Sequence, residues 1–592
     1  MQMRRFRTAQ RAPSASRRRR GLLPALVAFA CACAFVVQAP GWAQTSYMAL
    51  SKAFLDGTPQ IDKWHWESHD VAYTDGHYYS VKPPGLSIVT LPLYAGLRKA
   101  GGEGVARDAR IRGESHGNPW GARTLPTESY GYSRKRAIAA RAVIADDAPM
   151  VWALGLLGVL VPALILLVVV RRMVERVSPG TGTAAALTLG VGTMILPFST
   201  LYFSHVLSAL LAFGAFALLL REREREGGRE GAARPLALAG AGLLAGLAVV
   251  FEYPLLIAAA IIGLYAITRR GGSLIGRAGA YGGGVAAGTA PLLAYNVWAF
   301  GSPFHLSYEN AVARVGKNGH ATLGLNDGGI FGITFPRIGD GLELLFSGRG
   351  LLTLTPVIVL AIAGVIVMYR DGRHRTEARV ILAISIAFFV YNAGYWLPLG
   401  GGSPGPRFLI PILPFLAIGL GLAWRRWPAV TLALSAISAT SMAVATISYP
   451  MIGVNDPGEW LRRLFDYKIF QHSVLDLTGI AHGLPAIAPF ALIVALALGL
   501  GAATLGRHQL AVGARHVPAA VGIWALCAIV LPRPLQLPSA EALILIGVSA
   551  AIALLAVAGP WLLARSRSSA QPEEHHAGAP LSLEVQAAQR SS

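Results

Sequence analysis

The sequence predicts an all-α polytopic membrane protein with about fourteen transmembrane helices and a large first extracytoplasmic loop that contains interfacial helices. Three observations predict this class. Of the 592 residues, 54% are hydrophobic and only 14% are charged, whereas soluble proteins carry about a quarter charged residues. Long apolar runs alternate with short basic clusters. These clusters lie at the ends of the runs, where the positive-inside rule places cytoplasmic arginines and lysines.

The apolar runs are the predicted transmembrane helices. A helix needs about 20 residues to cross a hydrocarbon core of about 30 Å, and only helices satisfy their own backbone polar groups in lipid. The runs, in chain order, are 21–40, 150–170, 181–199, 203–220, 236–252, 254–268, 278–298, 350–369, 379–397, 406–424, 427–448, 486–505, 518–531 and 541–564.

Arginine placement predicts the orientation. Arg17 to Arg20 directly precede the first run, so residues 1–20 are expected to be cytoplasmic. Counting alternately from that end puts nearly every tight arginine cluster on the cytoplasmic side. These clusters are Arg171-Arg172 with Arg176, 221–234, Arg269-Arg270 with Arg277, 370–379, Arg425-Arg426, Arg507 with Arg515, and the tail from Arg565.

The same count defines the domain organisation. Residues 41–149 form the first outer loop, in which the short apolar stretch 86–97 is expected to lie in the membrane interface. Residues 21–450 form the main transmembrane domain, and 451–565 add a C-terminal outer loop and further transmembrane helices. Residues 566–592 are a polar tail that is expected to be cytoplasmic and disordered. The first run could instead be a cleaved signal peptide, but its near-spanning length favours a retained helix.

The excess of basic residues follows from membrane topology. The formal net charge is +21, but the sequence has no zinc-finger pattern and no basic stripe interleaved with stacking aromatics, so no nucleic-acid partner is expected. The three cysteines, Cys31, Cys33 and Cys527, lie in apolar runs, and no disulfide framework is expected.

The densest group of reactive side chains lies in the first outer loop. A carboxylate there can act as a general base, and a lysine can neutralise a phosphate. The alternative is an interfacial belt of aromatic residues with ordinary loop charges, but the density of functional groups favours a site. The candidates are the carboxylates Asp70 and Asp75 and the flanking side chains His77, Tyr78, Tyr79 and Lys82.

A metal site is a second interpretation of this loop. His65 and His69 are four residues apart, so on a helix they would share one face, with Asp70 as a third ligand. No metal ligand is assigned on this basis. A divalent metal stays an alternative, and no cofactor is required.

Further polar candidates lie at the predicted outer ends of helices, where an ionisable residue indicates function. Arginine in particular can hold a phosphate through two parallel hydrogen bonds. The alternatives are a snorkelling arginine, an ordinary loop and satisfied hairpin turns. These candidates are Arg407 in the stretch GGGSPGPRFLIPILPF, His305, Tyr308 and Glu309 after a helix exit, and His205 and Glu252 at helix ends.

The first-loop motif resembles a known family. The loop DGHYYSVKPPG and the apolar LPLY that follows it are similar to the first-loop region of the GT-C membrane glycosyltransferases. The resemblance is to the protein O-mannosyltransferase and aminoarabinose-transferase group (glycosyltransferase family 39-like). The family signature has a tyrosine and, two or three residues later, Lys-Pro-Pro. It matches Tyr78, Tyr79, Lys82, Pro83 and Pro84, and the later GPRFLIPILPF resembles the arginine-led helix of bacterial members.

The resemblance implies a reaction. Such enzymes take a sugar from a polyprenyl-phosphate carrier and transfer it to a lipid, glycan or protein acceptor on the outer side of the membrane. A loop carboxylate deprotonates the acceptor hydroxyl, the anomeric carbon inverts, and basic side chains, here Lys82 and Arg407, stabilise the departing lipid phosphate. The family places an acid just after the first helix, whereas the first acid here is Asp56. The catalytic assignment therefore moves to Asp70, with Asp75 second.

Two other classes stay open. A lipid or solute transporter or flippase would suit the helix count, but few charges lie inside the runs and no clear repeat is present. A non-catalytic membrane assembly subunit is the third class. The composition is typical of a GC-rich bacterial source, so the expected location is a bacterial cytoplasmic (inner) membrane.

Overall fold

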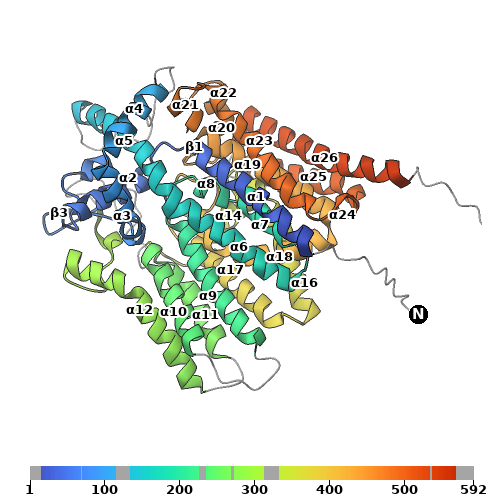
Figure 1. Cartoon of the computed structure of the whole chain (residues 1–592), viewed down its shortest axis with the longest axis horizontal. Helices are drawn as coiled ribbons and strands as arrows, with labels where there is room; N and C mark the ends of the chain where they lie inside the picture. Colours follow the sequence, from blue (N-terminus) through green and yellow to red (C-terminus); the bar gives the residue numbers. More distant parts are fainter. Residues whose placement is uncertain are drawn as a thin grey trace, which may run out of the picture.

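The computed structural model describes residues 15–68, 70–114, 134–225, 235–268, 273–312, 332–533 and 537–568. Nearly all regular structure in these residues is helical, with one two-stranded and one three-stranded sheet. Figure 1 shows a bundle of long helices with the elements of the first loop, α2, α3 and β3, gathered at one edge. The predicted all-α polytopic class is confirmed.

The first part of the chain forms α1 and the elements of the outer loop. The hairpin of β2 and β3 is joined by β4 from a distant part of the chain, in the order β3-β2-β4. Helix α3 buries Leu86 and Tyr94 and exposes the apolar side chains of Ile88 and Val89; its location in the membrane interface stays a prediction. The elements are α1 (Ala15–Phe35), β1 (Val36–Val37), α2 (Trp42–Leu55), η1 (His65–Glu67), β2 (Val71–Thr74), β3 (His77–Ser80), α3 (Gly85–Lys99) and α4 (Gly102–Glu114).

The central bundle contains the long apolar helices. Proline occupies the first turn of α6 (Val161–Val177), α18 (Leu413–Arg426), α19 (Pro428–Ser448), α23 (Pro489–Ala503) and α25 (Val517–Val530). The missing N–H of a proline at this position would have no helical partner in any case. The elements up to α17 are α5 (Arg134–Gly155), η3 (Leu156–Leu160), α6 (Val161–Val177), α7 (Gly182–Val191), α8 (Ile195–Phe198), α9 (His205–Arg225), α10 (Pro235–Phe251), α11 (Leu255–Ile267), α12 (Leu274–Phe300), η4 (Ser307–Asn310), β4 (Ala311–Val312), α14 (Ile338–Phe346), α15 (Leu351–Leu354), α16 (Val357–Asp371) and α17 (Arg375–Ala393).

The last third of the chain packs onto this bundle. The short strand β5 pairs with β1, with Val36 opposite Ser473, which joins the predicted C-terminal outer loop to the end of α1. The elements are η5 (Arg407–Ile412), α18 (Leu413–Arg426), α19 (Pro428–Ser448), α20 (Gly458–Phe465), β5 (His472–Ser473), α21 (Val474–Thr478), α22 (Leu484–Ile487), α23 (Pro489–Ala503), α24 (Arg507–Leu510), η6 (Ala514–His516), α25 (Val517–Val530) and α26 (Ala540–Ser568).

Each predicted apolar run overlaps a helix, but the count of about fourteen spans stays a prediction. By length and composition, eight helical segments among the described residues could cross a membrane. One further candidate is a pair, Ile338–Leu354 and Val357–Asp371, bent by 92°. The eight segments are Ala145–Val177, His205–Glu224, Arg375–Ala393, Arg407–Arg426, Pro428–Ser448, Leu484–Ala503, Arg507–Val530 and Ala540–Leu562, and four shorter apolar helices are Gly21–Phe35, Gly182–Val191, Pro235–Phe251 and Leu255–Ile267.

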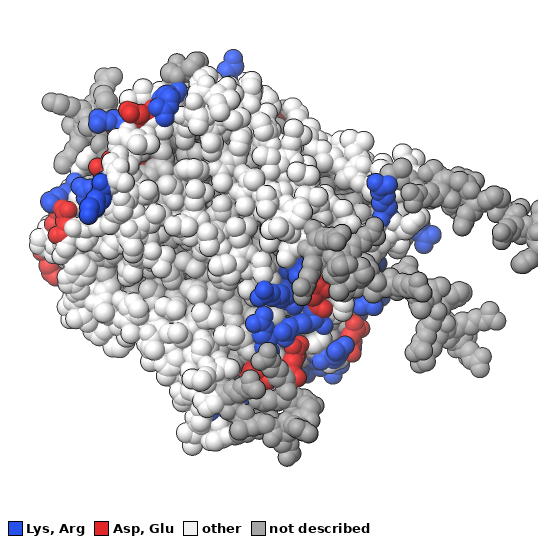
Figure 2. Space-filling model, viewed as in Figure 1, with Lys and Arg blue, Asp and Glu red and all other residues white. Residues whose placement is uncertain are grey.

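Several connections predicted to be cytoplasmic meet at one end of the bundle. Arg176, near the end of α6, pairs with Glu224 of α9. Arg277 of α12 is buried and pairs with Glu222 of α9, with 3.0 Å between Nη1 and Oε1. Figure 2 shows the charged side chains gathered toward opposite edges of the visible face, with uncharged surface between them. This distribution is typical of a bundle that crosses a membrane.

Candidate functional site

The β2–β3 hairpin brings Asp70 and Lys82 together. Asp70 directly precedes β2, and Lys82 lies two residues after the end of β3. The antiparallel register sets Val71 opposite Ser80, so the residues that flank this pair are also neighbours across the hairpin. Lys82 Nζ lies 2.8 Å from Asp70 Oδ2. The lysine side chain is 10% exposed and the aspartate side chain 28%, so the ion pair is partly screened from water.

A serine of α2 forms hydrogen bonds that anchor the backbone near this ion pair. Ser46 Oγ donates to the backbone carbonyl of Asp70 at 2.6 Å and lies 2.7 Å from Ser80 Oγ. Ser80 Oγ in turn accepts the backbone N–H of Lys82 at 3.1 Å. Both ends of the hairpin are therefore anchored to α2 by hydroxyl groups that are buried.

A second ion pair joins the start of α9 to the turn between α10 and α11. His205 Nδ1 is 3.0 Å from Glu252 Oε1. Ser204 donates its hydroxyl to the same carboxylate, and Tyr47 OH lies 2.7 Å from Ser204 Oγ. Glu252 is thus contacted by both an imidazole and a hydroxyl.

Tyr308, in η4, links the two ion pairs. Lys82 Nζ lies 5.9 Å from the centre of the Tyr308 ring, and the neighbouring Ser307 donates to the carbonyl of Val81 at 3.0 Å. Burial raises the pKa of Tyr308 well above its usual value, and the negative charges of Glu252 and Asp70 add to this effect. The tyrosine hydroxyl thus stays protonated and lies within electrostatic reach of both carboxylates.

Arg407 approaches the same region at the start of η5. Its guanidinium carbon lies 5.6 Å from the centre of the Phe203 ring and 5.3 Å from that of Phe408. The charge of Arg407 acts on Tyr308 and on Tyr395. Within the described parts of the chain, Arg407 forms no ion pair with a carboxylate, and its Nε has no hydrogen-bond partner. An arginine that rests on aromatic faces and lacks a carboxylate partner is suited to bind an anion.

The hairpin tip lies outside this cluster. Asp75 and Gly76 both have positive φ angles, 49° and 84°, which form a two-residue turn that Asp-Gly favours. Asp75 is exposed there. His77 Nδ1 pairs with Asp62 Oδ2 at 2.7 Å, and the backbone N–H of Tyr78 donates to the same carboxylate, with 2.6 Å between Tyr78 N and Asp62 Oδ1. These contacts stabilise the hairpin itself.

Three other predicted residues surround the cluster without joining it. Tyr79 is buried against Phe300, with 4.8 Å between ring centres. His305 lies 4.4 Å from the Phe300 ring, and its Nδ1 is 3.8 Å from Glu309 Oε2. Glu309 also accepts the backbone N–H of Leu306 at 3.0 Å. His305 and Glu309 therefore brace the short helix that carries Tyr308.

The residues described contain no group of three or more His, Cys, Asp or Glu side chains that could hold a metal ion. His69, one member of the predicted His65 and His69 pair, lies outside the described residues. The His65 ring stacks on Tyr78 with 3.9 Å between ring centres.

A buried charge cluster in the predicted outer loop was not expected from the sequence. Lys52 Nζ, in α2, lies 2.9 Å from Glu67 Oε2 and 2.6 Å from Asp147 Oδ2, so it joins α2 to η1 and α5. Burial raises the pKa of Glu67 to about 7, and the second carboxylate adds to this effect while Lys52 opposes it. One lysine faces two carboxylates, so protonation of Glu67 leaves the cluster electrically neutral.

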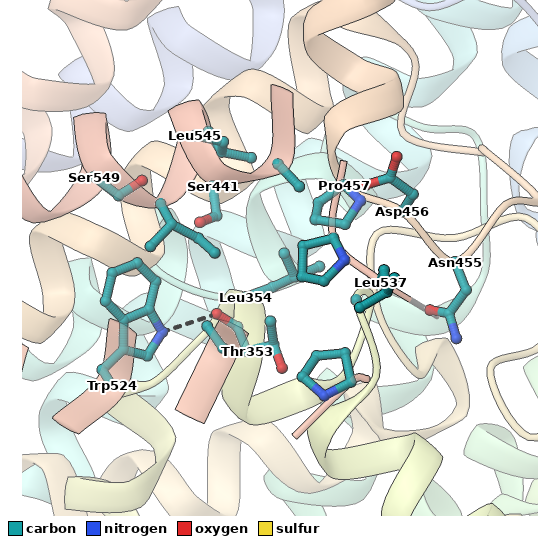
Figure 3. A pocket seen from close by; sticks show the side chains of 16 residues that line it. Thr353, Leu354, Ser441, Asn455, Asp456, Pro457, Trp524, Leu537, Leu545 and Ser549 are labelled. Atoms are coloured by element: carbon teal, nitrogen blue, oxygen red, sulfur yellow. Dashed lines mark hydrogen bonds between the residues drawn. The ribbon is translucent and has the colours of Figure 1, made fainter. Parts of the chain in front are cut away.

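An apolar cavity of about 30 Å³ lies apart from these groups, between α15, α19, α25 and α26. Figure 3 shows Trp524 at one side of it, with its Nε1 donating to the backbone carbonyl of Thr353 at 3.0 Å. Ser441, Ser549 and Asp456 also line the cavity. Its volume has room for about two water molecules, since one water needs about 10–15 Å³.

Comparison with known proteins finds similar solved structures only. No family model matches the chain, and no curated protein does. ArnT from Cupriavidus metallidurans bound to undecaprenyl phosphate is 14% identical over 85% of this chain and 80% of its own, with a TM-score of 0.41. Its apo structure has 14% identity, 85% and 79% coverage, and a TM-score of 0.39.

The apo oligosaccharyltransferase of Archaeoglobus fulgidus is also 14% identical, over 82% of this chain and 56% of its own, with a TM-score of 0.36. ArnT is an aminoarabinose transferase, so both proteins are glycosyltransferases of the GT-C class that the first-loop motif resembles. The likeness assigns no role to any residue of this chain.

Proposed function

We propose that this chain is a membrane glycosyltransferase that moves a sugar from a polyprenyl-phosphate carrier to a lipid, glycan or protein acceptor on the extracytoplasmic side. The observation that carries the proposal is the cluster around Tyr308. Asp70 and Lys82 form an ion pair, the charges of Asp70 and Arg407 both act on Tyr308, and those of Lys82 and Arg407 both act on Tyr395. Arg407 forms no ion pair with a carboxylate of the described residues. The proposed location is a bacterial cytoplasmic membrane.

The chemistry of sugar transfer needs these groups together. The acceptor oxygen forms a bond to the anomeric carbon while its proton passes to the carboxylate of Asp70. The bond between the anomeric carbon and the phosphate oxygen breaks, and its electron pair leaves with the polyprenyl phosphate. The anomeric carbon inverts in this single displacement. The developing negative charge on the phosphate is stabilised by Lys82 and Arg407, which are already oriented before the reaction.

The location of the cluster supports a lipid-linked donor. The cluster residues come from an outer-loop hairpin and from the ends of α9, α10 and η5, so a phosphate could reach them at the level where a polyprenyl chain enters the apolar bundle surface. Phe203 and Phe408 flank the Arg407 guanidinium and reduce its hydration. A cation in such surroundings attracts a phosphate more strongly than one in open water.

The test is sugar transfer by the purified protein in lipid nanodiscs, with radiolabelled sugars linked to undecaprenyl phosphate as donors. Wild type is compared with Asp70→Asn, Lys82→Ala and Arg407→Ala, and with Asp56→Asn as a matched control. Asp56 lies in the same loop but forms an exposed ion pair with Lys63, at 2.5 Å. We expect transfer by wild type and the control, and none above background by the three site variants.

Two outcomes would contradict the proposal. If wild type transfers no sugar from any donor but moves a labelled lipid or solute across vesicle membranes, the chain is a transporter. If wild type shows neither activity and partner proteins are lost from the membrane when the chain is deleted, it is an assembly subunit.

A further inference from the structure

Arg349 is a buried cation that the reaction above does not use. It lies in the turn between α14 and α15, and the residue is only 4% exposed. It forms no ion pair with a carboxylate in the described parts of the chain. Placing a charge in such surroundings is costly unless polar groups satisfy it. The location of those polar groups therefore indicates what the side chain does.

Four backbone carbonyls accept hydrogen bonds from the two terminal nitrogens of the guanidinium, whereas Nε has no partner among the described residues. Nη1 donates to the carbonyls of Gly401, Ser403 and Ile452 at 2.8, 3.0 and 2.9 Å, and Nη2 donates to that of Gly453 at 3.1 Å. These carbonyls belong to two segments that are about fifty residues apart in the chain. Arginine can bind them together because its planar guanidinium offers five donors in fixed directions, whereas lysine offers three donors from a single atom.

The first of these segments leads directly into Arg407. Gly400 and Gly401 have φ angles of +78° and +84°, a conformation that residues other than glycine rarely adopt. The stem of Arg407 lies against Gly400 so closely that a Cβ atom there would come within 2.7 Å of Arg407 Cγ and 2.8 Å of its Nε. The position of the Gly400 backbone therefore limits where the Arg407 guanidinium can lie.

The second segment closes the junction. Ser403 N donates to the carbonyl of Ile452 at 3.2 Å, and the backbone N–H of Arg349 donates to Asn455 Oδ1 at 3.0 Å. Arg349 is thus the common partner of the 400–403 loop and of residues 451–455. Without it, the four carbonyls of this junction would lose a charged donor, and the hydrogen bonds to two of them, Ser403 and Ile452, are buried.

We propose that Arg349 is a positioning residue for Arg407: it holds the 400–403 loop against residues 451–455 and so fixes the Arg407 guanidinium where the phosphate of the donor binds. This inference rests on the proposed function. Arg349 does not itself touch the donor, so its effect should pass through Arg407 alone.

The experiment is a double-variant cycle with Arg349→Lys and Arg407→Lys, singly and together, in nanodiscs. Lysine keeps the positive charge at position 349 but cannot reach carbonyls in four directions. We expect Arg349→Lys to raise the KM for the polyprenyl-phosphate sugar by about tenfold, the effect of one lost charge-assisted hydrogen bond. The KM for the acceptor should not change. In the Arg407→Lys background the same substitution should have little further effect.

Arg277→Lys is the matched control, because Arg277 is equally buried but binds Glu222 at the opposite end of the bundle. It should leave the donor KM unchanged. If Arg349→Lys does not fold, as judged by gel filtration and the thermal transition, Asn455→Ala takes its place because it weakens the same junction from the other side. Wild-type donor KM in a folded variant, or an effect of equal size in both Arg407 backgrounds, would overturn the inference.

If the proposed function is wrong, wild type transfers no sugar. The same four proteins of the double-variant cycle are then compared in their binding of undecaprenyl phosphate, measured by native mass spectrometry. Tight binding that weakens in Arg349→Lys only when Arg407 is present supports the positioning role without transfer. Wild type that binds no lipid phosphate overturns both proposals.

Discussion

Asp70→Asn is the substitution that tests the proposed catalytic base most directly. Asparagine has nearly the same shape as aspartate and can still accept a hydrogen bond from Lys82 Nζ, which lies 2.8 Å from the carboxylate. It cannot take a proton from the acceptor hydroxyl. General bases contribute about 10² to 10⁴ in rate, so kcat should fall by at least about a hundredfold.

The donor KM should not rise in this variant, because the loss of a negative charge beside Lys82 favours anion binding. The cost in stability should be small. Asp70 is 28% exposed, so solvent screens the ion pair, and its loss should cost about 1 kcal/mol. The thermal transition should therefore move by no more than a few degrees.

The assay is single-turnover transfer of a radiolabelled sugar, which isolates the chemical step from donor binding and product release. Asp56→Asn is measured in parallel. The reasoning is refuted if Asp70→Asn turns over at the wild-type rate, or if its rate falls only because the donor KM rises. In the first case the base is another group, and in the second Asp70 acts in binding.

Three further predictions concern the outer loop and the neighbouring ion pair. Asp75→Asn should leave transfer unchanged, because Asp75 is exposed in a turn with φ of 49° that asparagine tolerates; a loss of transfer would make Asp75 the base. Glu252→Ala should destabilise the protein by about 1–3 kcal/mol, because it removes the buried acceptor of His205; denaturation monitored by tryptophan fluorescence would measure this. Because burial raises the pKa of Glu67 to about 7, the folded state holds a proton that the unfolded chain releases. The stability that this proton contributes is fully present below the usual pKa of 4.5 and is lost as the pH rises from there through about 7. The thermal transition should therefore fall over this range, and Glu67→Gln should remove the dependence.

The sequence is sufficient to predict the helical class, and the outer-end location of most of the candidate groups stays a prediction from the same pattern. Apolar runs of spanning length can only be helices in lipid, and the alternation of arginine clusters assigns the helix ends to two sides. His205, Glu252 and Arg407 were each expected at an outer helix end. Side chains at the same end of a helix bundle lie at a similar depth. The order of the helices along the chain therefore accounts for the proximity of these three residues to Tyr308.

The register of β2 and β3 decides which residues of the first loop belong to the candidate site and which only stabilise the hairpin. Asp70 and Lys82 flank the paired residues Val71 and Ser80, and Asp75 occupies the tip. A shift of one residue would turn every side chain of the hairpin to the other face. The Asp-Gly pair signals a two-residue hairpin turn, so the exposure of Asp75 could have been predicted from this local signal. The carbonyls around Arg349 could not, because they are backbone atoms and leave no trace in residue type.

The absence of an acid directly after the first helix has an explanation in the anchoring of the hairpin. In α2, the helix that follows the first membrane segment, Ser46 holds the Asp70 carbonyl and Ser80 through one hydroxyl. A carboxylate at position 46 would lie beside the carbonyl of Asp70 and would repel it, since both groups are acceptors. A donor at position 46 therefore anchors the backbone at Asp70 and leaves the carboxylate of that residue on the hairpin, paired with Lys82.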